Sequence, residues 1–335
     1  MKEANYSNGD QYHYTYDAVG NHTEQQTLIG SVPLTTNYVY DAANRLISVD
    51  GVPYTWDNNG NLLTDGANSY TYNTANQLTA LSGPLGSSTF SYNGLGDRLS
   101  QNGVNYTLDL NAGLTQVLSD GTNTYLYGLG RIAENQGGVN EYYLGDALGS
   151  VRQLVRDGGE ITLARTYEPY GDLAQATGTA QTDYGFTGEF TDSSGLVYLR
   201  ARYYAPDTGR FFQQDPWDGV SEIPASLNPY LYGLNNPTRY TDPNGENPLA
   251  ALGALALWVG KGVAVGAVGG ALIGCLSYNS AISGQCGCEI QQQALSMTRT
   301  EWIGMFALMG GIVGGTINLA VLTPATTIIL VPQLD

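Results

Sequence analysis

The stretch YVYDAANRL at residues 38–46 decides the fold, because its pattern recurs along the first 145 residues. Two aromatic residues flank one other residue, and an Asp or Asn follows the second aromatic. This Asp or Asn recurs at steps of 16 to 24 residues, as Asp17, Asp41, Asp57, Asn73 and Asn93. A repeat this short cannot hold a pair of helices. It predicts one β-hairpin per unit.

The aromatic residues of each unit should share one face of a strand, since side chains alternate along β-structure. We expect these rings to stack on the rings of the neighbouring unit, and the following Asp, Asn and Gly to turn the chain. One unit cannot bury its aromatic face alone, so stacked units should build a long spiral sheet. Tyr and Asp are thus interpreted as packing and turn residues. A carbohydrate-binding aromatic surface is the alternative interpretation.

The composition agrees with strands joined by tight turns. The 335 residues include 25 Tyr, 6 Phe and 44 Gly, and Tyr and Gly suit pleated strands and left-handed turn positions. We therefore expect little helix before Asn247. The net charge is −17, and an acidic surface repels phosphate backbones. Direct nucleic-acid binding is not expected.

A second part of the chain carries its most specific sequence. Between residues 141 and 245 the segments EYYLGDALGSVRQLV, ARTYEPYG, YGFTGEFTDSSGLVYLRARYYAPDTGRFFQQDP and NPYLYGLNNPTRYTDPNG follow in that order. This order resembles the core of the Rhs and YD-repeat family, which includes polymorphic toxins and the shells of Tc-toxin C components. The resemblance covers roughly residues 12–245.

The resemblance implies a mainly β protein. A spiral of YD-repeat hairpins over residues 1–145 should wrap as a cocoon-like shell, and residues 146–245 should form the Rhs core. Residues 246–335 lie where this family places its variable effector. We expect a secreted or cell-surface toxin fragment, with upstream repeats, a secretion apparatus and an immunity protein as partners. The N-terminus shows no secretory signal, so the export signal should lie upstream.

Self-cleaving members of this family use an Arg and two Asp residues, which correspond here to Arg202, Asp215 and Asp242. Two carboxylates held close together cannot both ionise easily, so one keeps a proton while the other activates water. The resemblance places the cut near Gly245, Glu246 and Asn247. An aspartyl self-cleaving core is therefore one predicted activity, and no other catalytic arrangement is visible.

Two departures from the family pattern affect this prediction. Glu246 stands where the family has Leu at the cut, and DPWDG at residues 215–219 replaces the usual D-P-x-G. A carboxylate seated in an apolar pocket beside two others should add a like charge and a desolvation penalty. The alternative is that Asp215 and Asp242 only form turns before Pro.

Metal and cofactor chemistry is not expected. The three cysteines, Cys275, Cys286 and Cys288, form no spaced set of metal ligands. The histidines, His13 and His22, both lie in the repeats.

The last ninety residues change to Ala, Leu, Gly, Val and Ile. Residues 249–276 and 302–322 each have about the length that crosses a bilayer core. Small residues recur at every fourth position, which allows close helix packing. We predict an α-helical hydrophobic hairpin packed through Gly262, Gly266, Gly270, Gly274, Ala307, Gly311 and Gly315.

Three functions fit this tail. It could be a membrane-inserting or pore-forming effector with a target membrane as partner, an anchor or translocation hairpin, or a hydrophobic plug inside the shell. The first is the favoured prediction. A non-toxic surface-binding module with a plug or anchor is the third function class, beside the toxin and the self-cleaving enzyme.

Overall fold

The computed structural model describes residues 1–128, 130–246, 321–322 and 328–329. The chain divides into two units, Met1–Leu252 and Gly253–Asp335. In the second unit the described residues form one short antiparallel pair, β26 (Val321–Leu322) with β27 (Ile328–Ile329). The predicted helical hairpin and its glycines otherwise lie outside the described residues. The last two residues of the predicted helical segment 302–322, Val321 and Leu322, form strand β26 instead of helix. The β-branched and aliphatic residues on either side of Pro324 favour a strand there.

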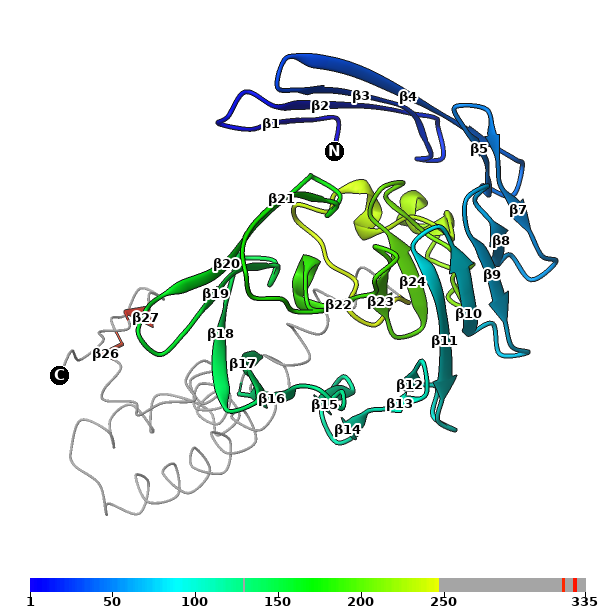
Figure 1. Cartoon of the computed structure of the whole chain (residues 1–335). Helices are drawn as coiled ribbons and strands as arrows, with labels where there is room; N and C mark the ends of the chain where they lie inside the picture. The colour runs from blue at the N-terminus through cyan, green and yellow to red at the C-terminus, as the bar shows by residue number, and fades with distance from the viewer. Residues whose placement is uncertain (129, 247–320, 323–327, 330–335) are drawn as a thin grey trace, which may run out of the picture. The chain divides into compact units, whose positions relative to one another are not determined.

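The first unit is built from antiparallel strands that pair in chain order (Figure 1). The first sheet contains β1 (Glu3–Asn5), β2 (Gln11–Tyr16), β3 (His22–Ile29), β4 (Val32–Tyr40), β5 (Leu46–Val49) and β6 (Val52–Pro53). The second contains β7 (Thr55–Trp56), β8 (Leu62–Thr64), β9 (Ser69–Tyr72), β10 (Leu78–Gly83), β11 (Gly86–Tyr92), β12 (Arg98–Gln101) and β13 (Val104–Asn105).

The third sheet continues the same meander and leads into the core. It contains β14 (Thr107–Asp109), β15 (Gln116–Ser119), β16 (Thr124–Tyr127), β17 (Arg131–Gln136), β18 (Val139–Gly145), β19 (Val151–Val155), β20 (Ile161–Tyr167) and β21 (Leu173–Gly178). A fourth sheet of β22 (Phe190–Thr191), β23 (Val197–Leu199), β24 (Arg202–Ala205) and β25 (Arg210–Phe211) follows. The helical turns are η1 (Phe186–Gly188), η2 (Pro224–Leu227) and η3 (Gly233–Asn235). The expected scarcity of helix before Asn247 is thus confirmed for the described residues.

The Asp after each aromatic pair caps a five-residue turn. Oδ1 of Asp17 accepts hydrogen bonds from the backbone amides of Val19 and Asn21 at 3.0 and 2.8 Å. Asp57 repeats this geometry with Asn59 and Asn61, and Asn73 and Asn93 do so in later units. The turn therefore needs a short side chain that carries an oxygen acceptor, which explains why both Asp and Asn occur there.

Each of these turns coincides with a β-bulge in the ladder. The register shifts just before the second aromatic residue in the first hairpins, at Tyr16, Tyr40 and Trp56. The same shift recurs at Tyr92 and Tyr127. Bulges bend a strand and increase its twist. A bulge repeated at one edge of every unit therefore curves the meander, and Figure 1 shows β1 to β21 following an arc with β22 to β24 on its inner side.

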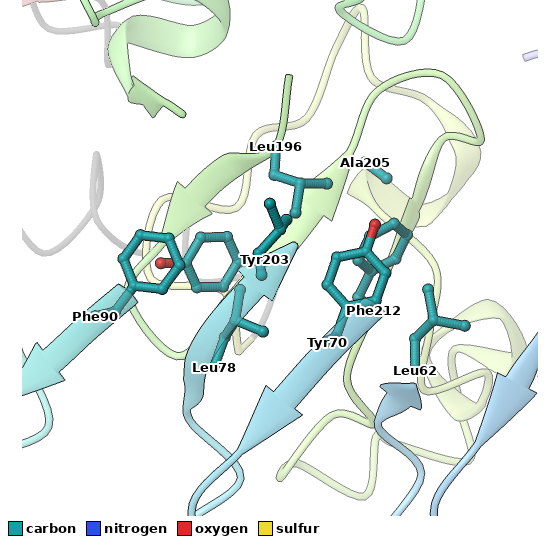
Figure 2. Close-up of a cluster of buried hydrophobic side chains, with 9 residues drawn as sticks. Leu62, Tyr70, Leu78, Phe90, Leu196, Tyr203, Ala205 and Phe212 are labelled. Carbon is teal, nitrogen blue, oxygen red and sulfur yellow. The ribbon is translucent and has the colours of Figure 1, made fainter. Parts of the chain in front are cut away.

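The aromatic rings of the repeats pack mainly against the core rather than against each other. The expected stacking between neighbouring units is therefore wrong for most of them, because the turn after β20 and residues 184–230 supply the partner rings. Ring centroids lie 5.1 to 5.7 Å apart in the pairs Tyr14–Tyr170, Trp56–Tyr230, Tyr70–Phe212, Phe90–Tyr203 and Tyr125–Tyr184. Figure 2 shows one such cluster, where Leu62, Tyr70, Leu78 and Phe90 of the repeats meet Leu196, Tyr203, Ala205 and Phe212.

Candidate active site

Arg202 begins β24 on the inner side of the repeat arc. Its side chain is 1% exposed, and its guanidinium carbon lies 3.6 Å from the centre of the Phe211 ring. All four residues of β24 are buried, because Tyr203 packs against the repeats and Tyr204 against the core. A buried guanidinium needs counter-charges and acceptors close by.

Both predicted carboxylates reach this guanidinium. Nη2 of Arg202 lies 2.7 Å from Oδ2 of Asp215 and 3.4 Å from Oδ2 of Asp242. Asp215 is 10% exposed and Asp242 is fully buried. Nη1 of Arg202 donates to the carbonyl of Pro229 at 2.9 Å. The structure therefore brings together Arg202, Asp215 and Asp242, the three residues that were predicted from the sequence.

Asp215 also forms the turn that its sequence suggested. Its Oδ1 accepts a hydrogen bond from the amide of Trp217 at 2.9 Å, while its own amide donates to the carbonyl of Pro229 at 3.0 Å. Burial raises the pKa of Asp215 to about 6; Arg202 opposes this rise, and Asp242 adds to it. Near pH 6 both the protonated and the ionised form of this carboxyl are therefore populated.

The segment after Asp242 runs past the same guanidinium. Nε of Arg202 donates to the carbonyl oxygen of Gly245, and the amide of Gly245 donates to the carbonyl of Asp242 at 3.2 Å. Gly245 has a φ of +68°, and a Cβ built there would lie 2.3 Å from the carbonyl oxygen of Leu199. Only glycine fits this position without displacing the backbone.

The site opens into a cleft of about 930 Å³. Turn residues of the repeats line one side of it, and Arg202, Asp215 and the end of the described core line the other. Glu246 lies at this cleft with an exposed side chain, and Nδ2 of Asn244 donates to its carboxylate at 3.3 Å. The desolvation penalty expected for Glu246 in an apolar pocket is therefore absent here, because that carboxylate faces solvent.

Other predicted positions fall outside what the structure describes. These are Asn247 at the expected cut and Gly262, Gly266, Gly270, Gly274, Ala307, Gly311 and Gly315 in the tail. In residues 1–246 apart from 129, no group of three His, Cys, Asp or Glu side chains is arranged to hold a metal ion.

Sequence reasoning missed two neighbours of the site. Arg200 donates through Nη1 to the carbonyl of Pro243 and to Glu189, and Phe211 lies against the Arg202 guanidinium. The letters LRAR gave no signal for Arg200, because Arg200 lies in the turn between β23 and β24 rather than on a strand.

Comparison with known proteins agrees with this architecture. A sequence model of the Teneurin YD-shell family matches residues 2–238. The tRNA3(Ser)-specific nuclease WapA of Bacillus spizizenii is 29% identical over 261 residues, which are 72% of this chain and 11% of that protein. The toxin protein Tse5 of Pseudomonas aeruginosa is 37% identical over 113 residues, which are 33% of this chain and 8% of that protein.

A solved structure shares the fold. The crystal structure of TcdB2-TccC3-TEV aligns with a TM-score of 0.54 at 23% identity, over 70% of this chain and 13% of that one. This chain thus corresponds to a small part of the longer proteins that it matches. With more than two thirds of its length matched by the family model, the chain belongs to the Teneurin YD-shell family.

Proposed function

We propose that residues 1–246 are a self-cleaving YD shell that cuts its own chain after the Asp-Pro-Asn-Gly turn. One observation carries this proposal: a single buried guanidinium contacts Asp215, Asp242 and the carbonyl of Gly245. Aspartyl proteolysis needs two carboxyl groups that share a proton beside a polarised carbonyl. No further cofactor is required by this chemistry.

The proposed reaction is hydrolysis of one peptide bond at the end of this turn. The ionised carboxyl accepts a proton from water as the water oxygen bonds to the carbonyl carbon, and the protonated carboxyl donates to the carbonyl oxygen. The tetrahedral intermediate then collapses, the C–N bond breaks, and the leaving nitrogen takes up a proton. Arg202 stabilises the charge that develops on the oxygen.

In its biological setting we propose that this shell belongs to a secreted or cell-surface toxin. The support is the set of similar proteins, whose names include a tRNA nuclease, a toxin protein and toxin subunits. Further upstream repeats, a secretion apparatus and an immunity protein would then be its partners. The shell would hold and release whatever follows the cut.

A second candidate function concerns the tail as a membrane-inserting or pore-forming effector. The observation in its favour is the sequence of residues 262–274, where glycine recurs at every fourth position within an apolar run. Among the residues that the structure describes, no helix is long and apolar enough to cross a membrane. An anchor and a plug are the competing roles.

The self-cleavage proposal is tested by the intact mass of the purified chain. We expect two fragments for wild type, and one uncut chain for Asp215→Asn and for Asp242→Asn. Asp218→Asn is the matched control, since Asp218 lines the same cleft but is exposed. Glu246→Leu should raise the cut fraction. If both Asn variants split at the same bond as wild type, the assignment is wrong.

The tail proposal is tested by dye release from liposomes. We expect the cleaving chain to release dye and Asp215→Asn to release less, because its tail stays attached. Replacing Gly266 and Gly270 with Leu should reduce release while leaving membrane association intact. Absence of release by the cleaved wild-type chain would exclude the pore and favour an anchor or plug.

A further inference from the structure

The turn between β23 and β24 lies along the segment that the proposed reaction cuts. Arg200, Ala201 and Arg202 each donate to one of three successive carbonyl oxygens. The Arg200 side chain donates to Pro243, the Ala201 amide donates to Asn244 at 3.2 Å, and the Arg202 side chain donates to Gly245. Three consecutive donors thus hold three consecutive acceptors in one register.

Arg200 is itself held firmly in place. Its φ of +62° is left-handed, a conformation that non-glycine residues keep only where their surroundings enforce it. Its Nη1 lies 2.9 Å from Oε2 of Glu189, and the two side chains are 22% and 13% exposed. Glu189 therefore orients the guanidinium that reaches Pro243.

The register of this segment matters because Arg202 already has many partners. It contacts Asp215, Asp242, the Pro229 carbonyl and Gly245. A shift by one residue along the segment would bring a different carbonyl to Arg202. The bonds of Arg200 and Ala201, two and one residues upstream, oppose such a shift.

We propose that Arg200 is a positioning residue: together with Ala201 it fixes the register of residues 243–245, so that the Gly245 carbonyl is presented to Arg202, Asp215 and Asp242. This inference rests on the proposed self-cleavage. Arg200 acts through the bound segment, and the reacting groups remain those of Arg202, Asp215 and Asp242.

The first test compares Arg200→Ala and Arg200→Lys with wild type by the time course and position of self-cleavage. We expect Arg200→Ala to cut about 10- to 100-fold more slowly, since displacement of reacting atoms by about 1 Å has effects of that size. Its products should end at more than one residue by intact mass. Arg200→Lys should restore part of the rate, because it keeps a cationic donor.

Two features separate positioning from a general structural role. The midpoint of the pH profile should stay at the wild-type value, because Asp215 keeps its surroundings. Arg156→Ala is the matched control, since it removes an Arg that pairs with Glu141 and Glu160 elsewhere in the fold, and it should leave rate and cut position unchanged. A wild-type rate and a single wild-type cut in Arg200→Ala would overturn the inference.

The second test works without self-cleavage, in an Asp215→Asn chain that stays whole. An added glutamyl endopeptidase should cut after Glu246 at least several-fold faster when Arg200→Ala is also present. Cutting after Glu222, in an exposed loop of the same chain, is the internal control. Equal susceptibility at Glu246 with and without Arg200 would show that Arg200 does not hold the segment. If wild type and Glu246→Leu never self-cleave, the proposed function fails, and this second test still decides whether Arg200 holds residues 243–245 in place.

Discussion

The ion pair between Arg98 and Asp192 joins the repeats to the core, and replacing Arg98 with Met should destabilise the first unit strongly. Nη1 of Arg98 lies 3.0 and 3.1 Å from the two carboxylate oxygens of Asp192, and the side chains are only 2% and 3% exposed. The guanidinium also lies 4.4 Å from the centre of the Phe190 ring and 4.3 Å from that of Tyr198.

The expected loss is about 3 to 5 kcal/mol of unfolding free energy, the usual effect of leaving one charge of a buried pair uncompensated. Burial raises the pKa of Asp192, and Arg98 opposes that rise. Without Arg98 the folded-state pKa rises further, so the folded protein binds a proton more tightly than the unfolded chain. The variant should therefore keep most stability at low pH and lose it as pH rises through that folded pKa.

Urea unfolding at pH 5 and pH 8 measures both effects. Arg45→Met is the matched control, since it breaks the Arg45–Asp41 pair, whose side chains are 32% and 22% exposed, and such pairs contribute about 0 to 1 kcal/mol. Arg98→Met with Asp192→Asn should recover part of the loss, because no buried charge remains. If Arg98→Met costs no more than Arg45→Met at either pH, the buried pair does not hold the repeats to the core.

Three further predictions concern the site and its surroundings. Self-cleavage should slow by about tenfold per pH unit above the Asp215 pKa of about 6, because the reaction needs one protonated carboxyl; an unchanged rate between pH 5 and pH 8 would contradict this. Gly245→Ala should leave the chain uncut by intact mass, since its Cβ would meet the Leu199 carbonyl at 2.3 Å, whereas Gly195→Ala, with a φ of +86° and open space, should still cleave. Burial lowers the pKa of His22 to about 3, so the unfolded chain binds an extra proton below its ordinary value of about 6.5. Unfolding free energy should therefore fall as pH drops from 6.5 towards 3, and His22→Phe should flatten that slope in acid unfolding.

The hairpins could be predicted from the sequence because their determinants are local. Asp17 and its equivalents cap turns through hydrogen bonds to residues two and four positions ahead. A short sequence pattern therefore includes every residue that the turn needs. The partner of each ring could not be predicted in the same way. Tyr70 packs on Phe212 and Phe90 on Tyr203, residues far along the chain whose meeting depends on how the arc curves.

The candidate site shows the same difference between features set by local sequence and contacts between residues far apart in the chain. Arg202, Asp215 and Asp242 could be proposed from motifs, but their meeting depends on β24 and on two turns that lie apart in the sequence. The contact of Arg200 with Pro243 depends on the left-handed turn at Arg200, with its φ of +62°. Nothing in the letters LRAR distinguishes that turn from a continuous strand.

The two interpretations of Asp215, turn former and catalytic acid, turn out to use different oxygens of one carboxylate. Oδ1 accepts from the Trp217 amide, the same two-residue bond that Asp17 makes with Val19, while Oδ2 faces Arg202. Asn at this position can keep the turn through its own Oδ1, but its Nδ2 would then face a guanidinium donor and could neither accept a proton nor balance the charge. Asp215→Asn should therefore preserve the turn and remove the chemistry. That separation makes the uncut variant a test of mechanism rather than of folding.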